Sequence, residues 1–177
     1  MHRVLLKLNN FISLLEQFIL AYGVISLALI TIGNVISRKL FNHSWSFAEE
    51  LSQFILVIIT FMGISYAARR GRHIRMTAFY EMVGEKAKRI LMIVISLTTM
   101  IILFYLSYHA LLFVLKVKGY GRVTPALRLP FYWMILWAPL GLFLGGVQYL
   151  LTLIKNIVHK DVWLSFEEKS EYQDLTT

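Results

Sequence analysis

The acidic side chains near the long apolar stretches of this 177-residue chain are the first candidates for chemistry. Ionisable groups inside a membrane mark ion or proton pathways by default. For Glu16 we weigh a proton or ion site against an acid near the membrane surface that snorkels or pairs with a partner subunit's cation. For Glu50, a transport-coupling acid competes with a structural bridge from Arg38 to Glu50 or Glu49, and we favour the bridge. Glu49 is explained by helix capping, in a box with Ser46.

The sequence offers few residues that could carry out redox or hydrolytic chemistry. His109 is the only histidine inside an apolar stretch, whereas a membrane haem needs two axial ligands from facing helices. The sequence has no cysteine, no aspartate before Asp161 and no metal-binding motif. We therefore expect no enzyme, no catalytic or metal site and no cofactor.

Four apolar runs must position these residues, and each is long enough for a membrane-spanning helix. The expected fold is an all-α integral membrane protein with four transmembrane helices and amphipathic interfacial helices. The segment 3–13 is read as interfacial or as an extension of the first helix. The spans are expected at about 14–37, 47–68, 90–115 and 131–154, the interfacial helices at about 3–13 and 74–88, all in a single domain 1–160 followed by a polar tail 161–177.

Charge placement predicts the topology. Hydrophobic residues make up 58% of the chain and charged residues 16%, against roughly 25% charged in soluble domains. Of the 18 Lys and Arg, twelve lie in the N-terminus, middle loop and C-terminus. The positive-inside rule therefore predicts both termini in the cytoplasm of a bacterial inner membrane. The net charge of +8 is spread over helix ends that meet lipids, so we expect no nucleic-acid partner.

Small and polar residues at helical spacing predict faces that pack against protein instead of lipid. The first span has such a row through Glu16, Gly23, Asn34 and Arg38, and the fourth has Gly141-x-x-x-Gly145. Pro139 is expected to kink the fourth span at its outer end. A basic stop, Arg69-Arg70-Gly71-Arg72-His73, ends the second span. Such unbroken helices favour a support over an autonomous transporter, which needs repeats and broken helices.

Several motifs in order resemble those of the small membrane subunit (DctQ-like) of tripartite ATP-independent periplasmic (TRAP) transporters. The resemblance runs from about Leu5 to Ile154. The motifs are Asn34-Val35 with Arg38 and Phe41-Asn42, Trp45 with Glu49-Glu50-Leu51, Phe61-Met62-Gly63, Ala67-Ala68-Arg69-Arg70-Gly71-Arg72-His73-Ile74, Thr124-Pro125-Ala126-Leu127-Arg128-Leu129-Pro130 and Pro139-Leu140-Gly141.

The resemblance implies a scaffold for a large elevator-type membrane subunit, in sodium-driven uptake of an organic acid such as sialic acid or a dicarboxylate. A periplasmic binding protein would deliver the solute, and sodium coupling would reside in the large subunit. A free-standing channel or a redox-complex anchor is the alternative. The structural candidates are Arg38, Glu49, Glu50, Glu16, Asn34, Arg69, Arg70, His73, Gly141 and Gly145, and the periplasmic docking candidates are Arg122 and Arg128.

Overall fold

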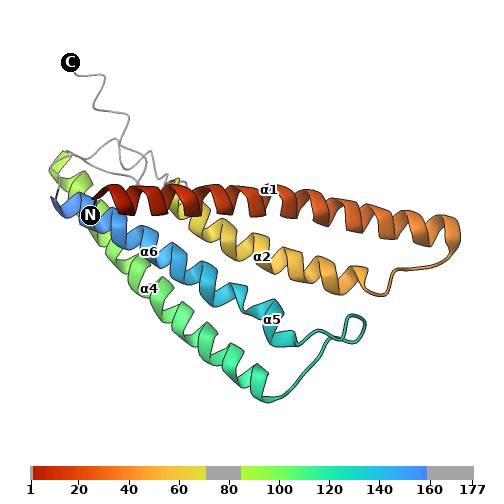
Figure 1. The fold of residues 1–177 in the computed structure, drawn as a ribbon. Helices are drawn as coiled ribbons and strands as arrows, with labels where there is room; N and C mark the ends of the chain where they lie inside the picture. Colours follow the sequence, from red (N-terminus) through yellow and green to blue (C-terminus); the bar gives the residue numbers. More distant parts are fainter. Residues whose placement is uncertain (1, 71–84, 159–177) are drawn as a thin grey trace. The chain divides into compact units, whose positions relative to one another are not determined.

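The computed structural model describes residues 2–70 and 85–158 (Figure 1). The described chain is helical apart from its connecting loops and one isolated β-bridge between Val123 and Pro130. Its helices are α1 (His2–Phe41), α2 (Ala48–Arg69), α4 (Glu85–Gly119), α5 (Phe131–Ile135) and α6 (Trp137–Val158).

Four stretches of helix in the described residues are long and apolar enough to cross a membrane, as the hydropathy pattern predicts. They are Ile12–Phe41, Ala48–Arg69, Ala87–Gly119 and Phe131–Val158. The 3–13 segment is part of the continuous helix α1, which agrees with its reading as an extension of the first span. Most of the expected 74–88 helix, and the 161–177 tail, lie outside the described residues.

The fourth span is interrupted near its start, where the sequence predicts a kink. α5 ends at Ile135 and α6 begins at Trp137. Pro139 has no N–H, so it cannot donate to the carbonyl of Ile135 four residues earlier. One helical hydrogen bond is therefore missing at this point. Leu136 keeps right-handed helical dihedral angles and its N–H donates to the Tyr132 carbonyl, so the interruption is short.

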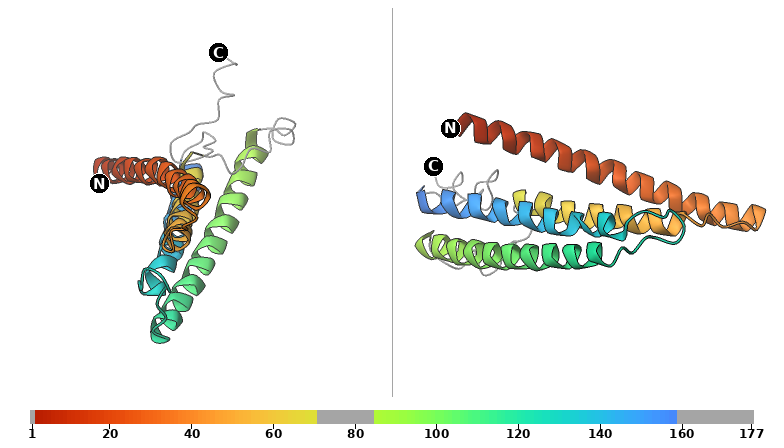
Figure 2. Two further views of the ribbon diagram at one scale, coloured as in Figure 1. Left: turned by 90° about the vertical axis from the view of Figure 1, so that its right-hand side faces the viewer. Right: turned by 60° about the horizontal axis from the view of Figure 1, so that its bottom comes forward.

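The chain divides into two compact units, and we describe each by itself. Unit 1 comprises residues 1–63 and 108–141, and unit 2 comprises residues 64–107 and 142–177. In unit 1, α1 and the first part of α2 are joined by the loop 42–47, and a second loop, 120–130, joins the end of α4 to α5 (Figures 1 and 2).

Glycines bring the helices of unit 1 close together. A Cβ atom at Gly23 of α1 would lie 2.8 Å from Cγ1 of Ile59 in α2. A Cβ atom at Gly141 of α6 would overlap the main-chain carbonyl of Phe61, also in α2. The absence of a side chain at these positions therefore permits helix backbones to approach, which is the packing predicted for both rows.

Unit 2 has one loosely packed and one tightly packed glycine on α6. A Cβ atom at Gly145 would lie 3.4 Å from Cγ2 of Ile64, which is an ordinary contact. The adjacent Gly146 faces the ring of Phe104, whose centroid is 5.6 Å from that of Phe143. In unit 2, Gly145 of α6 thus lies against both α2 and α4, and Gly146 lies against α4.

Candidate functional site

The loop 120–130 in unit 1 is a compact, hydrogen-bonded structure. The Phe131 N–H donates to the Arg122 carbonyl at 2.9 Å, and the Thr124 N–H donates to the Leu129 carbonyl at 2.9 Å. The Thr124 side chain closes the loop further, because its hydroxyl oxygen accepts the Leu129 N–H at 3.1 Å. Arg128 adopts a φ of +52°, a left-handed conformation that permits the tight return.

Glu50, in the first turn of α2, holds the tip of this loop. One carboxylate oxygen accepts the N–H of Ala126 at 2.7 Å, and the other accepts the N–H of Leu127 at 2.8 Å. Bonds from amides to a charged acceptor are shorter and stronger than neutral ones, and an acid in the first helical turn also interacts favourably with the helix dipole. We call this carboxylate and its two amides the Glu50 clasp.

The clasp replaces the ion pair predicted from the sequence. Arg38 is exposed on the last turn of α1 and makes no ion pair with Glu49 or Glu50 in the described structure. The predicted bridge is therefore not formed between the described residues, and the Glu50 oxygens accept main-chain N–H groups instead. Hydropathy and spacing carry no information on this pairing, since Glu50 and Ala126 are 76 residues apart.

Asn34 holds the first loop of unit 1, residues 42–47, in a similar way. Its side-chain oxygen accepts the Trp45 N–H at 2.8 Å and the Ser44 hydroxyl at 3.2 Å. The Trp45 ring packs against Gly33, the residue before Asn34. A Cβ atom at Gly33 would come within 2.9 Å of this ring. The row predicted to pack against protein therefore does so at Asn34.

Glu49 is exposed and does not form the predicted capping box. α2 begins at Ala48, whose N–H donates to the Trp45 carbonyl, so the helix starts later than a cap at Ser46 requires. Glu49 and Glu50 still place two acids in the first turn, where the dipole favours them.

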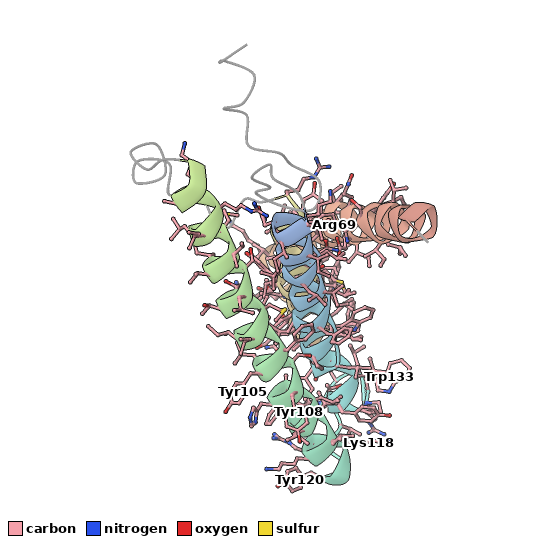
Figure 3. The ribbon with its side chains drawn as sticks, turned by 90° about the vertical axis from the view of Figure 1, so that its left-hand side faces the viewer. Arg69, Tyr105, Tyr108, Lys118, Tyr120 and Trp133 are labelled. Carbon is pink, nitrogen blue, oxygen red and sulfur yellow. The ribbon has the colours of Figure 1, made fainter. Side chains whose placement is uncertain are left out.

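Basic and aromatic side chains surround the second loop. The Lys118 ammonium lies 5.7 Å from the centre of the Tyr132 ring, and the Arg122 guanidinium lies 5.7 Å from that of Phe131. Figure 3 shows Lys118, Tyr120 and Trp133 gathered at this end of unit 1. Tyr120 and Trp133 are largely exposed, and Arg122 and Arg128 are exposed as well. The loop thus presents cations and rings around a fixed backbone.

Unit 2 contains buried polar side chains on three helices. Six side chains with relative exposures of 0 to 3% compose this polar core: Ser65 and Arg69 on α2, Ser96 on α4, and Gln148, Thr152 and Asn156 on α6. On α6 the polar side chains bond to their own helix: the Thr152 hydroxyl donates to the Gln148 carbonyl at 2.9 Å, and the Asn156 amide donates to the Thr152 carbonyl at 3.0 Å.

Three arginines of unit 2 lie near the ends of helices. Arg69 is fully buried at the end of α2, where Figure 3 labels it, and Arg70 lies 5.7 Å from the ring centre of Tyr66. Arg89 donates to the carbonyls of Asn156 and Ile157 at 2.8 and 2.9 Å, so a cation caps the C-terminal end of α6. His73 lies outside the described residues.

Sequence reasoning found part of this core and missed the rest. The row from Gly141 and Gly145 through Gln148 and Thr152 reaches Asn156 at the same helical spacing, and this extension was the available signal. Ser96 is one of several hydroxyls on α4 and carries no distinguishing pattern. Glu16 of unit 1 is buried, with 2% relative exposure, and its role as an ion site or as a paired acid near the membrane surface stays a prediction.

Comparison with known proteins places this architecture in a family. Residues 27–159 match the family model described as "Tripartite ATP-independent periplasmic transporters, DctQ component". The chain is also similar to the ectoine TRAP transporter small permease protein TeaB of Halomonas elongata. The two are 43% identical over 174 residues, which cover 98% of this chain and 90% of TeaB. The chain belongs to the DctQ family.

Membership agrees with the resemblance inferred from the ordered motifs. DctQ-family small permease subunits work with a large membrane subunit and a periplasmic binding protein. The chain is therefore a multi-pass inner membrane component of a transporter, which is not a class of enzyme.

Proposed function

We propose that this DctQ-family chain is the immobile scaffold of the large elevator-type subunit in sodium-driven solute uptake. The observation that supports the proposal most is the 43% identity to a TRAP small permease protein over 98% of the chain. The helices add support, because α1, α2 and α4 are continuous and the α5–α6 interruption lies near one end of its span. In this proposal sodium and solute bind in the large subunit, and this chain needs no cofactor.

The solute we propose first is ectoine, since the related permease protein carries that solute in its name. Sialic acid and dicarboxylates, the expectation from the sequence, are the alternatives. Cells expressing the three components would be assayed for uptake of each labelled solute with and without a sodium gradient. Sodium-dependent uptake of ectoine alone supports the first choice, and uptake of another solute instead contradicts it.

The orientation we propose places both termini in the cytoplasm and the loops 42–47 and 120–130 in the periplasm. The twelve Lys and Arg in the termini and middle loop support it through the positive-inside rule. The chain has no cysteine, so a single Tyr120→Cys or Lys88→Cys variant can be labelled with an impermeant maleimide in whole cells. Labelling at position 120 alone is expected, whereas labelling at position 88 alone reverses the topology.

We further propose that the loop held by the Glu50 clasp helps to dock the periplasmic binding protein. Arg122 and Arg128 are exposed there beside Lys118, so this surface suits an acidic patch on the partner. Replacing both arginines by Gln should raise the concentration of binding protein needed for half-maximal uptake. An unchanged half-maximal concentration would argue against docking at this loop.

The proposal is tested against a free-standing channel or redox anchor by co-purification. An affinity tag on this chain should retain the large subunit in mild detergent after salt washing. Purification of the tagged chain alone, with solute conductance or a haem absorption band, would favour the alternatives.

A further inference from the structure

Arg128 has an unusual backbone conformation for its residue type. Three of the residues that the structure describes have φ angles of +52° to +60°, namely Asn42, Gly121 and Arg128. Glycine has no Cβ atom to clash in this left-handed region, and asparagine is one of the few other residues that tolerate it. Arginine has neither property. Strained backbone positions of this kind cluster at functional sites, so the conformation of Arg128 points to a role for its side chain.

Thr124 holds Arg128 in this conformation from across the loop. The Arg128 N–H donates to the Thr124 carbonyl at 3.1 Å, and the N–H of the following residue, Leu129, donates to the Thr124 hydroxyl at 3.1 Å. The Leu129 carbonyl in turn accepts the Thr124 N–H at 2.9 Å. The peptide groups on both sides of the Arg128 Cα atom are therefore bonded to one residue, which fixes both soft dihedral angles of Arg128.

The Thr124 hydroxyl also reaches the Glu50 clasp. It donates to the Glu50 carboxylate, while its oxygen accepts the Leu129 N–H. A threonine hydroxyl has one donor and can accept as well, so the two bonds are compatible. Thr124 is only 4% exposed, so water has little access to replace a bond that is lost there. Thr124 thus connects the clasp to the main chain of Arg128.

We propose that Thr124 is a positioning residue, which directs the guanidinium of Arg128 toward a carboxylate of the periplasmic binding protein. This inference rests on the proposed docking function of the loop. Arg128 is exposed, and a planar guanidinium binds a carboxylate through two parallel hydrogen bonds that require a defined direction. The second arginine of the loop is oriented differently, because the Arg122 guanidinium lies against the ring of Phe131.

Removal of the hydroxyl alone tests the role of Thr124. Thr124→Val keeps the shape of the side chain and loses both hydroxyl bonds, whereas Thr124→Ser keeps the hydroxyl. Proteoliposomes with both membrane subunits would take up the solute found in the three-component assay, with purified binding protein added at increasing concentration. We expect Thr124→Val to raise the half-maximal concentration about threefold, as for lost neutral hydrogen bonds, at an unchanged maximal rate and complex yield. Thr124→Ser should match the wild type.

A double substitution tests whether Thr124 acts through Arg128. Arg128→Gln should raise the half-maximal concentration of binding protein about tenfold, since hydrogen bonds to a charged group are lost. If Thr124 directs this arginine, Thr124→Val should add nothing in the Arg128→Gln background, because the effects of residues that act together are not additive. A hydroxyl that acts independently of Arg128 would give the same increase in both backgrounds, and that result overturns the inference.

Two glycine substitutions test the left-handed backbone. Arg128→Gly relieves the strain and removes the guanidinium, so we expect an unfolding temperature at or above that of the wild type together with weaker docking. Asn42→Gly, at the other left-handed residue with a side chain, is the matched control and should leave the half-maximal concentration unchanged. Docking of Arg128→Gly that equals the wild type would show that the left-handed arginine has no role in docking, and it overturns the inference.

Failure of the docking loop and failure of Thr124 give different results. If the combined Arg122→Gln and Arg128→Gln substitution leaves the half-maximal concentration unchanged, the proposed docking itself fails. If that substitution responds but Thr124→Val does not, or if Thr124→Val and Thr124→Ser behave alike, only the role of Thr124 is wrong. Loss of the complex from the membrane in Thr124→Val also overturns this role, because the hydroxyl would then serve assembly.

Discussion

The two units of this chain use polar side chains for different purposes. In unit 1, Asn34 and Glu50 accept main-chain N–H groups from loops, and these bonds lie at exposed or part-buried positions. In unit 2, the polar core is buried on helices. Water can replace a lost bond at an exposed loop, but nothing replaces one in a buried core. We infer that the clasp positions a surface, whereas the polar core determines whether the protein folds.

Substitution of Arg69 should produce the largest effect. Its side chain is fully buried, so Arg69→Met removes a buried cation together with the interactions that it makes, at a cost on the order of 3 kcal/mol. We expect a lower unfolding temperature in detergent and less intact complex. Arg122→Met, at an exposed arginine of unit 1, is the control. A normal unfolding temperature for Arg69→Met would show that burial does not make the polar core essential.

The glycine row of α6 sharpens the comparison, because the two glycines belong to different units. Gly141→Ala places a methyl group on the Phe61 carbonyl and should cost about 1–3 kcal/mol through overpacking. Gly145→Ala meets Ile64 at an ordinary contact distance and should be nearly neutral. Thermal unfolding of the two purified variants measures the difference. Equal destabilisation would contradict the difference in packing between Gly141 and Gly145.

The Glu50 clasp should respond in transport more than in folding. In Glu50→Gln one side-chain oxygen remains for one amide, while the new NH2 group faces the other N–H donor. We expect normal abundance of the complex and a roughly threefold to tenfold higher half-maximal concentration of binding protein, as one charge-assisted bond is lost. Loss of the complex from the membrane instead would give Glu50 a role in assembly.

Arg38→Ala should have the smallest effect. The side chain is exposed and makes no ion pair with the two glutamates of α2 in the described structure. Complex yield and uptake are therefore expected to match the wild type, within the ±0.5 kcal/mol or so typical of surface substitutions. A marked loss of uptake would return Arg38 to the site and indicate a partner on another subunit.

Local sequence patterns predicted the helices but not the long-range contacts. Hydropathy located all four spans, and the missing N–H of Pro139 located the interruption before α6. Glycine spacing identified the close approach at Gly141. The Glu50 clasp could not be found in this way, because a carboxylate near a helix start suits a cation, a cap or a distant loop equally well. The burial of Ser96 and Asn156 likewise depends on which faces meet.

Reconstitution into liposomes tests the scaffold role most directly. Vesicles would contain this chain alone, the large subunit alone or both, with the binding protein and ectoine added outside under a sodium gradient. We predict sodium-dependent uptake only when both membrane subunits are present. Uptake by vesicles that contain this chain alone would contradict the account.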